Sequence, residues 1–278
     1  MKDGGAVAGN EWQGKTGASW AAEWQQTDRS FAPLTGALLD RAGSAPFQSF
    51  IDIGCGAGDL ALALAAHSPA AHAVGLDISA QLIAIARNRS GHNAHLAFEI
   101  GDAASWLPSH GFRPDLLVSR HGVMFFDDPA GAFRHLHDLL ADDGRLLFSC
   151  FRPWNENPVF RDIAALLPGP VRAPDPSQPG PFAFGDADRV DRILRDAGWG
   201  DVTFEPLDFS MVLGEGSDAV DQAIHYFTHI GVASRAMRDL EQDARHSLIQ
   251  RIRDFAAGKL EVGIVSLPAA CWIVSANR

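Results

Sequence analysis

Three glycines at alternate positions follow a short apolar run in the stretch FIDIGCGAGDLAL, residues 50–62. They are Gly54, Gly56 and Gly58, and Asp52 lies two residues before the first of them. An apolar run, a glycine turn and a helix-like segment predict a strand that leads into a helix N-terminus. There a ligand can approach main-chain N–H groups that side chains would otherwise cover. The stretch therefore predicts a backbone cradle for a polar ligand.

The spacing of these glycines separates two kinds of ligand. Dinucleotide-binding enzymes use G-x-G-x-x-G, in which the third glycine tightens the helix against the strand. Gly54 and Gly56 fit that pattern, but its third glycine position holds Asp59. An acid at the start of the helix repels a pyrophosphate but tolerates a ligand that ends in a zwitterionic amino acid. The spacing favours the second ligand, with a nicotinamide-dependent oxidoreductase as the alternative.

Strand-like and helix-like segments alternate on both sides of this turn. Short apolar runs are separated by helix-like segments, and Ser79 stands where a helix N-cap is expected. This alternation predicts a parallel sheet covered by helices on both faces. The expected strands are 47–54, 71–77, 95–102, 114–120 and 144–151, and the expected helices are 59–67, 79–88 and 129–141.

A helix-like segment, residues 11–39, precedes the first strand. It contains three of the seven tryptophans of the chain, Trp12, Trp20 and Trp24. Large aromatic side chains so close to one another predict a cover for an apolar pocket. We expect this segment, and Trp20 in particular, to pack over the pocket at the glycine turn.

The regular alternation stops after Phe151. Eight prolines lie between Pro153 and Pro181, so this stretch is neither one long helix nor a central strand. It predicts a linker or an ordered lid over the ligand side of the sheet, at residues 153–184.

The last third of the chain predicts a return to the sheet after a helical excursion. A helix at 187–197 and a strand at 201–209 are followed by helical residues 217–258 and a final strand at 267–276. The expected units are an N-terminal helical segment at 1–46, a core at 47–209 plus 263–278, and a helical cap insertion at 210–262.

The motif at Asp52, Gly54 and Gly56 resembles the first motif of the class I S-adenosylmethionine-dependent methyltransferases. Three further features of that family follow in order, each at the end of an expected strand. In the family an acid after the second strand meets the ribose, and one after the third strand faces the adenine. The end of the fourth strand lies beside the transferable methyl group. The resemblance implies a cofactor site of Asp52, Gly54, Gly56, Asp77, Ile78, Asp102, Ala103 and Ser119, with Trp20 over it.

A closer resemblance is to the bacterial small-molecule methyltransferases of the ubiquinone/menaquinone-biosynthesis-like group. Those often begin with W-x-G-x-x-G-x-x-W, which here spans residues 12–20, and carry the GVMFF and FRPWNENP stretches seen at 122–126 and 151–158. The resemblance implies an α/β fold with a doubly wound, seven-stranded, mostly parallel sheet that ends in an antiparallel hairpin. It also implies that S-adenosyl-L-methionine is the cofactor and S-adenosyl-L-homocysteine the product.

His121 directly follows the fourth expected strand, where the resemblance places the methyl group. An imidazole that titrates near neutrality can take a proton from a hydroxyl while the methyl group moves. We therefore expect His121 to be the catalytic base. The other readings of this residue are a polar wall of the pocket and a histidine bonded to the backbone.

Aromatic and histidine residues predict the acceptor end of the pocket. Phe125 and Trp154 are candidates for an apolar substrate wall. His225 and His229 are four residues apart on an expected helix, which is a metal-ligand spacing, but the sequence offers no evident third ligand. We expect both histidines to line the substrate pocket and expect no metal.

The amino-acid composition of the chain excludes some classes of binding partner. The chain of 278 residues has 23 basic and 34 acidic residues, a net charge of −11, and only three lysines. Nucleic-acid binding normally rests on a positive patch, so a nucleic-acid substrate is not expected. Neither a signal core nor an apolar run of about 18 residues occurs, and the three cysteines are far apart, so we expect a cytoplasmic protein without membrane insertion. A homodimer is one possible assembly.

Together these features predict an enzyme that methylates a small, apolar or aromatic acceptor, with O-methylation ahead of C- or N-methylation. Methylation of a base or a glutamine is disfavoured, because residues 119–122 read Ser-Arg-His-Gly rather than the Asn/Asp-Pro-Pro-Tyr tetrad that the resemblance would then require. The alternatives are the oxidoreductase, a non-catalytic cofactor-binding protein, and a methyltransferase fold turned to other chemistry.

Overall fold

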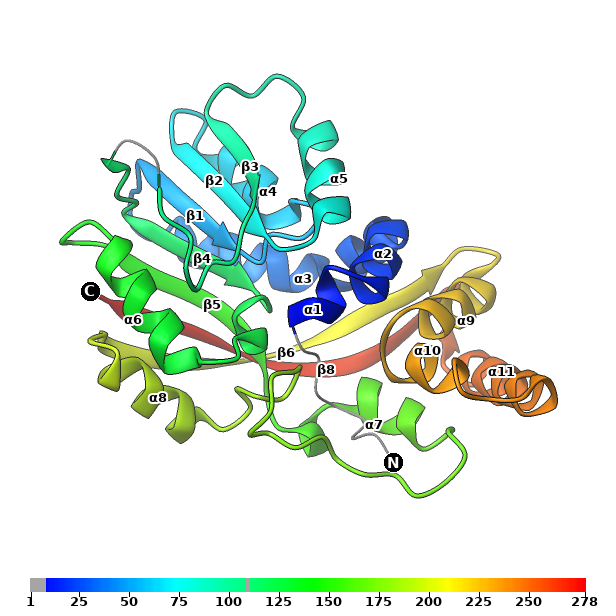
Figure 1. Cartoon of the computed structure of the whole chain (residues 1–278). Helices are drawn as coiled ribbons and strands as arrows, with labels where there is room; N and C mark the ends of the chain where they lie inside the picture. The colour runs from blue at the N-terminus through cyan, green and yellow to red at the C-terminus, as the bar shows by residue number, and fades with distance from the viewer. Residues whose placement is uncertain (1–8, 109–110) are drawn as a thin grey trace.

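The alternating segments form one mixed sheet with helices on both faces, in a computed structural model that describes residues 9–108 and 111–278 (Figure 1). The order of the strands is β3-β2-β1-β4-β5-β8-β6, and β7 pairs with β8 alone. The first five strands are parallel, and β8 lies antiparallel to β5 and β6. The strands are β1 (Ser49–Ile53), β2 (His72–Asp77), β3 (Leu96–Ile100), β4 (Leu116–Arg120), β5 (Arg145–Phe151), β6 (Gly200–Glu215), β7 (Leu260–Glu261) and β8 (Ile264–Asn277).

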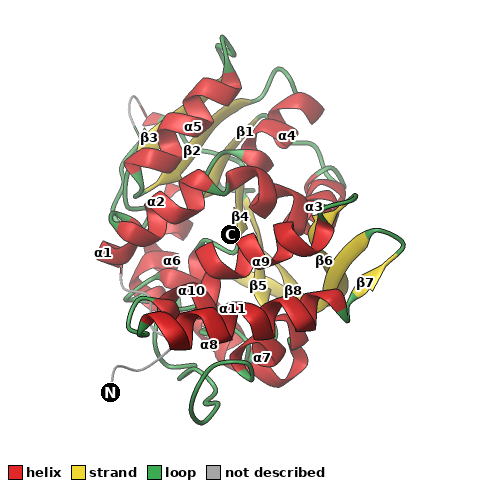
Figure 2. Ribbon diagram, turned by 90° about the vertical axis from the view of Figure 1, so that its right-hand side faces the viewer, coloured by secondary structure: helices red, strands yellow, loops and turns green. Residues whose placement is uncertain are grey.

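The helices cover both sides of this sheet. Figures 1 and 2 show α3 and α4 over one face and α6 and α8 over the other. The helices before β5 are α1 (Gly9–Trp12), α2 (Lys15–Ala22), α3 (Trp24–Ala42), α4 (Asp59–His67), α5 (Ala80–Ser90) and α6 (Pro129–Leu139). Those after it are α7 (Pro158–Ala164), α8 (Ala187–Asp196), α9 (Ala219–His229), α10 (Gly231–Met237) and α11 (Gln242–Ala257).

The predicted fold class is confirmed, with two corrections to the strands. The expected strand at 201–209 continues to Glu215, because β8 stays paired with it from Asn277 back to Ile264. Helix α3 also holds this extension, since Ser30 Oγ donates a hydrogen bond to the Val212 carbonyl at 2.9 Å. The sheet has eight strands rather than seven, because the two-residue β7 turns back onto β8. The three domain-like units themselves stay a prediction.

Strand order decides where a ligand can bind. Strand β1 pairs with β2 on one side and β4 on the other, so the connections leave β1 and β4 in opposite directions. The carboxyl ends of strands at such a reversal border a crevice, in which open α/β sheets bind ligands. The glycine turn after β1 and residues 121–122 after β4 lie at this crevice.

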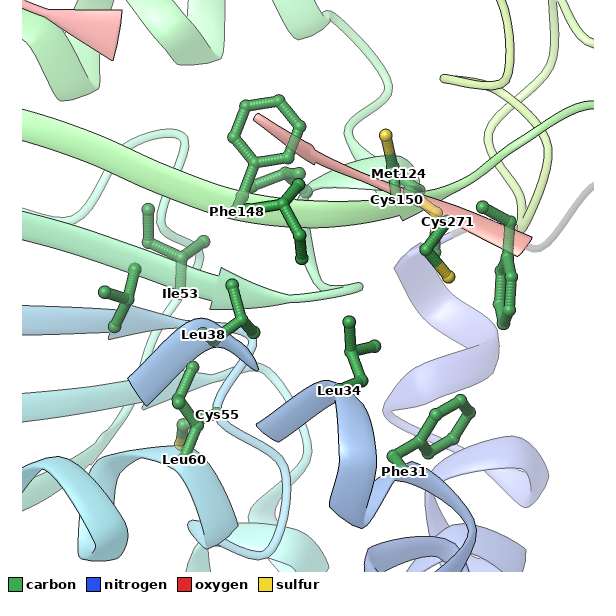
Figure 3. Close-up of a cluster of buried hydrophobic side chains, with 14 of the residues drawn as sticks. Phe31, Leu34, Leu38, Ile53, Cys55, Leu60, Met124, Phe148, Cys150 and Cys271 are labelled. Carbon is green, nitrogen blue, oxygen red and sulfur yellow. The ribbon is translucent and has the colours of Figure 1, made fainter. Parts of the chain in front are cut away.

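The core is continuous beneath the crevice. Figure 3 shows side chains of α3, among them Phe31 and Leu34, in one cluster of buried side chains with Cys150 of β5 and Cys271 of β8. All three cysteines, which include Cys55, are buried and unbridged. None of the described helices is both long and apolar enough to cross a membrane.

The proline-rich stretch is ordered by one buried amide. Asn157 precedes α7, and its side chain donates to the carbonyls of Arg152 and Ala270 and accepts from the Ala270 N–H at 2.9 Å. These bonds tie the start of the 153–184 segment to β8. Because the side chain is buried and each of its polar atoms is used, it acts as a structural anchor.

The N-terminal segment forms three helices rather than one, and it approaches α5 closely at Gly17. A methyl group at Gly17 would overlap the Trp12 carbonyl oxygen and lie 2.6 Å from Oγ of Ser79, the N-cap of α5. A glycine here lets α2 rest against the helix whose start borders the crevice. The tryptophans of α1, α2 and α3 reach the crevice through this contact.

We predict that Gly17→Ala separates α2 from α5 and lowers the melting temperature. Gly36→Ala in α3 is the matched control, because a methyl group there meets nothing within 4 Å. The control should gain stability, since alanine is favoured over glycine in a helix by about 1 kcal/mol. Thermal unfolding of both variants measures the difference, and equal melting temperatures would contradict the close contact.

Candidate functional site

A cavity of about 1210 Å³ lies along the crevice, between the sheet edge, the N-terminal helices and helices α9 and α10. Its wall runs from the glycine turn to the 153–184 segment and α10. Most of the candidate residues predicted from the sequence line it. These are Asp52, Gly54, Gly56, Asp77, Ile78, Asp102, Ala103, Trp20, His121, Phe125, Trp154 and His229. Ser119 and His225 do not line it.

Each glycine of the turn has its own role. A methyl group at Gly54 would lie 2.7 Å from the Cα of Gly122, so the turns after β1 and β4 touch through their backbones. Gly58 similarly makes room for the Phe98 ring. Gly56 has a φ of 56°, and a methyl group there would meet nothing within 4 Å. Gly56 therefore leaves open space on the cavity wall, as a backbone cradle requires.

Asp52 is buried at the end of β1 without a regular hydrogen bond. Neither of its carboxylate oxygens has a partner among the described residues. Burial raises the pKa of Asp52 to about 8, and the Arg120 charge and the Ala61 amide oppose this rise only in part. A carboxyl group in this state lacks a cation or a donor. Its oxygens are covered by protein atoms, although Asp52 as a residue borders the cavity.

Asp77 at the end of β2 links the two turns on its side of the crevice. Its Oδ2 accepts a hydrogen bond from the Gly56 N–H at 2.9 Å, and its Oδ1 accepts one from the Ser79 N–H at 2.8 Å. Burial raises the pKa of Asp77, and these two bonds oppose the rise. A carboxylate has about four lone-pair directions, so Asp77 can accept two further hydrogen bonds from a ligand.

Asp102 and Ser119 organise the loops after β3 and β4. Asp102 Oδ1 accepts a hydrogen bond from the Ala104 N–H at 2.9 Å and lines the cavity with Ala103. The Ser119 hydroxyl donates to the Ile53 carbonyl at 2.7 Å and accepts from the Gly122 N–H at 3.0 Å. Because its side chain is buried between the two turns, Ser119 holds the cavity floor instead of facing the cavity.

An ion cluster that the sequence analysis missed ties the N-terminal helices to this floor. Arg120 at the end of β4 donates to Asp59 Oδ2 at 2.6 Å and to Thr35 Oγ1 at 2.7 Å. Arg89 of α5 pairs with Asp28 of α3 at 2.9 Å. Asp59, the residue that breaks the dinucleotide pattern, is thus an ion partner. No sequence signal joins these residues, because they come from four elements, α3, α4, α5 and β4, that are far apart along the chain.

His121 is half-buried beside the aromatic core and lines the cavity. Its ring stacks on Phe151 with centroids 4.1 Å apart, and its Nδ1 lies 3.3 Å from the Ser149 carbonyl oxygen. A carbonyl only accepts, so Nδ1 carries the proton, and Nε2 lies 3.7 Å from the Cys271 sulfur. Burial, with the Arg120 charge, lowers the pKa of His121 to about 3. The expectation that this imidazole titrates near neutrality is wrong, because the sequence did not reveal its burial. The role as catalytic base stays a prediction.

Aromatic side chains line the far wall. Trp12 packs edge-on against Trp20 and Phe125, with centroid distances of 5.4 and 5.0 Å. Trp154 packs against Phe182 at 5.3 Å. The N-terminal helices and the loop after β4 thus meet through an aromatic contact, and the 153–184 segment adds an aromatic pair of its own to the same cavity.

The histidine pair on α9 divides between two environments. His225 Nε2 lies 2.8 Å from Glu23 Oε1, at the junction of α2 and α3, whereas His229 reaches the cavity. The two rings stack with centroids 4.0 Å apart. Glu23 supplies the third ligand type that the sequence did not reveal, since the three side chains offer ligand atoms within 4.8 Å of one another. The prediction that His225 contacts substrate has no support in this geometry.

A methyltransferase domain family model matches residues 47–198, more than half of the chain. The sequence is 32% identical over 154 residues to a trans-aconitate 2-methyltransferase of Methylobacterium radiotolerans, covering 55% of this chain and 54% of that protein. It is 30% identical over 125 residues to a malonyl-[acyl-carrier protein] O-methyltransferase of Brevibacillus brevis, covering 43% and 45%. The chain spans about half the length of these curated relatives.

Solved structures share the fold at low sequence identity. A putative methyltransferase of Bacillus halodurans matches with a TM-score of 0.54 and 17% identity, over 87% of this chain and 97% of that one. Phosphoethanolamine N-methyltransferase 2 of Haemonchus contortus matches with a TM-score of 0.58 and 16% identity, over 98% and 61%. The resemblance found in the sequence is confirmed, and the chain belongs to the methyltransferase domain family, with the fold of the class I S-adenosylmethionine-dependent enzymes.

Proposed function

We propose that the protein transfers a methyl group from S-adenosylmethionine to an oxygen of a small acceptor. The observation that carries this proposal is the single cavity that connects the glycine turn with the aromatic wall and α10. One end offers the polar groups that suit the cofactor. The other end offers an apolar chamber in which an acceptor can meet the methyl group away from water.

The residues at the polar end fit the cofactor. Asp52 is a buried carboxyl group without a partner among the described residues, and it suits the ammonium of the methionine portion once the glycine turn moves to uncover its oxygens. Gly56 leaves its wall open for close approach. Asp77 retains two acceptor directions for ribose hydroxyls, and Asp102 with the Ala103 amide suits the adenine. In this assignment the chain's residues bind and orient the cofactor, while Trp20 covers it.

The low basicity of His121 favours an acceptor oxygen that is already ionised before the methyl group is transferred. When bound, S-adenosylmethionine supplies a methyl group on a positive sulfur, and its transfer to an anionic oxygen forms a C–O bond, breaks the C–S bond and moves no proton. A neutral, half-buried imidazole with a pKa of about 3 is a weak base. Carboxylates are ionised at neutral pH, whereas most hydroxyls are not. Two relatives are named for trans-aconitate and malonyl acceptors, both of which carry carboxylates. These points favour a carboxylate oxygen over the hydroxyl expected from the sequence.

We predict that Gly56→Ala abolishes cofactor binding at a modest cost in stability. Alanine at positive φ is strained by about 1 kcal/mol, and its methyl group would project into the open cradle. Gly91→Ala is the matched control, with a φ of 58° and open space beside it but no place on the cavity wall. Calorimetric titration with S-adenosylmethionine should show loss of binding in Gly56→Ala alone. The same titration with NADH tests the oxidoreductase alternative, which tight NADH binding would favour.

We predict that Asp52→Asn stabilises the free protein and weakens its binding of the cofactor. The pKa of Asp52 is raised from 3.8 to about 8, so the folded state binds an extra proton between these values and the unfolded state does not. Stability of the free wild type therefore falls as pH rises through that window. The variant should melt a few degrees above wild type at pH 8 and close to it at pH 4.

Affinity for S-adenosylmethionine should fall in the same variant by about 1.5–3 kcal/mol, the scale for a hydrogen bond to a charged group. A variant that melts below wild type at pH 8, or that keeps full affinity, would contradict the assignment of Asp52.

We predict that His121→Asn leaves the pH profile of turnover unchanged between pH 5.5 and 8. Asparagine tolerates the positive φ of 66° at this position better than most residues do. Loss of a true general base costs about 10²–10⁴-fold, so a reduction under about tenfold is expected here. Release of S-adenosylhomocysteine measures turnover with any acceptor found by screening. An acid limb that disappears in the variant would restore His121 as the base.

A further inference from the structure

Four arginines line the cavity, and Arg235 differs from the others. Arg120 is held by the ion cluster below the floor, and Arg172 and Arg238 are exposed to solvent. Arg235 on α10 is partly buried. Across the described residues, its guanidinium makes neither a side-chain hydrogen bond nor an ion pair.

A partly buried arginine without a partner destabilises the free protein, which indicates that an anion binds beside Arg235. An arginine remains charged at every physiological pH, and a charge taken out of water without a partner destabilises the fold. Burial lowers the pKa of Arg235, the Glu11 charge compensates only at a distance, and the Arg238 charge opposes it. The Arg235 nitrogens are not sealed in the core, since the side chain lies on the cavity wall. An anionic group in the cavity would complete the pairing.

The charge around Arg235 favours an anion in this part of the cavity. Arg172 and Arg238 line the same cavity without ion pairs in the described structure, and Asp175 is the acid that the 167–182 segment adds to it. The whole chain is acidic, with a net charge of −11. Arg235 and Arg238, three residues apart at α10, are therefore a local positive feature of a cavity whose lining also holds seven aspartates.

We propose that Arg235 binds a carboxylate of the acceptor, which makes the acceptor an organic acid with a second anionic group besides the oxygen that is methylated. This inference rests on the proposed methyl transfer and adds the class of acceptor to it. A guanidinium matches a carboxylate through two parallel N–H···O bonds, which set orientation as well as affinity. Arg235 is thus a specificity residue: it positions the acid along the cavity, while Arg172 and Arg238 attract it.

The test compares the wild-type chain with Arg235→Gln, Arg235→Lys and Arg251→Gln. Arg251 lies exposed on α11, off the cavity wall, and serves as the control. The probes are trans-aconitate, other di- and tricarboxylic acids, and the neutral methyl ester of each. Calorimetry with the S-adenosylhomocysteine complex measures binding, and release of S-adenosylhomocysteine from S-adenosylmethionine measures turnover.

For at least one acid, Arg235→Gln should weaken binding and raise KM by about ten- to hundredfold, the worth of a charge-assisted hydrogen bond. The affinity and KM of Arg235→Lys should lie between those of wild type and Arg235→Gln, because lysine keeps the positive charge but not the two parallel N–H donors of the guanidinium. Neutral esters and the Arg251→Gln control should show no change. Acids that bind Arg235→Gln as tightly as wild type, or good acceptors that are all neutral, would overturn the inference.

A second measurement needs no acceptor. Arg235→Met removes a charge without a partner and keeps the apolar stem, so the free protein should melt a few degrees higher. A lower melting temperature would show that Arg235 has a structural partner and would also overturn the inference. Failure of the proposed methyl transfer is a separate result, recognised when wild type does not bind S-adenosylmethionine at all.

Discussion

The site depends on one close contact, the approach of the turn after β1 to the turn after β4. Gly54 and Gly122 touch through their backbones, and the Ser119 hydroxyl bonds to both turns. Any side chain at either glycine would push the strand ends apart and open the floor of the cavity. This contact exists because β1 and β4 are neighbours at the reversal of strand order. The cofactor end and the acceptor end then share one floor.

Ion pairs hold the N-terminal helices, which cover the cavity, to the strand ends beneath it. Arg120 and Arg89 reach from the sheet and α5 to Asp28 and Asp59, which joins α3 to the strand ends. Partly buried pairs of this kind add little net stability, but breaking one partner leaves a charge without compensation. The cluster therefore specifies where α3 sits more than how stable the fold is. The tryptophans of the N-terminal helices are placed over the cavity as a consequence.

Two ionisable side chains of residues that border the cavity have no hydrogen-bond or ion-pair partner among the described residues. Asp52 sits at the glycine turn and Arg235 on α10, and the cavity connects them. Their signs are opposite, as a cationic cofactor group and an anionic acceptor require. Both are costs to the free protein that a ligand would remove. The two groups thus lower the stability of the free protein, and pairing them with ligands would add to the binding free energy of the cofactor and the acceptor.

The sequence alone determined the class of fold and the polar residues that border the crevice. Local periodicity marks each strand end, and the resemblance to the class I methyltransferases singled out Asp52, Asp77 and Asp102 there without coordinates. Only the tertiary structure decided the state of the charged groups: that His121 is half-buried and weakly basic, that Asp59 pairs with Arg120, and that Arg235 has no partner among the described residues. Burial and Coulomb energy depend on distances between segments far apart in the chain, and such distances leave no periodic signal in the sequence.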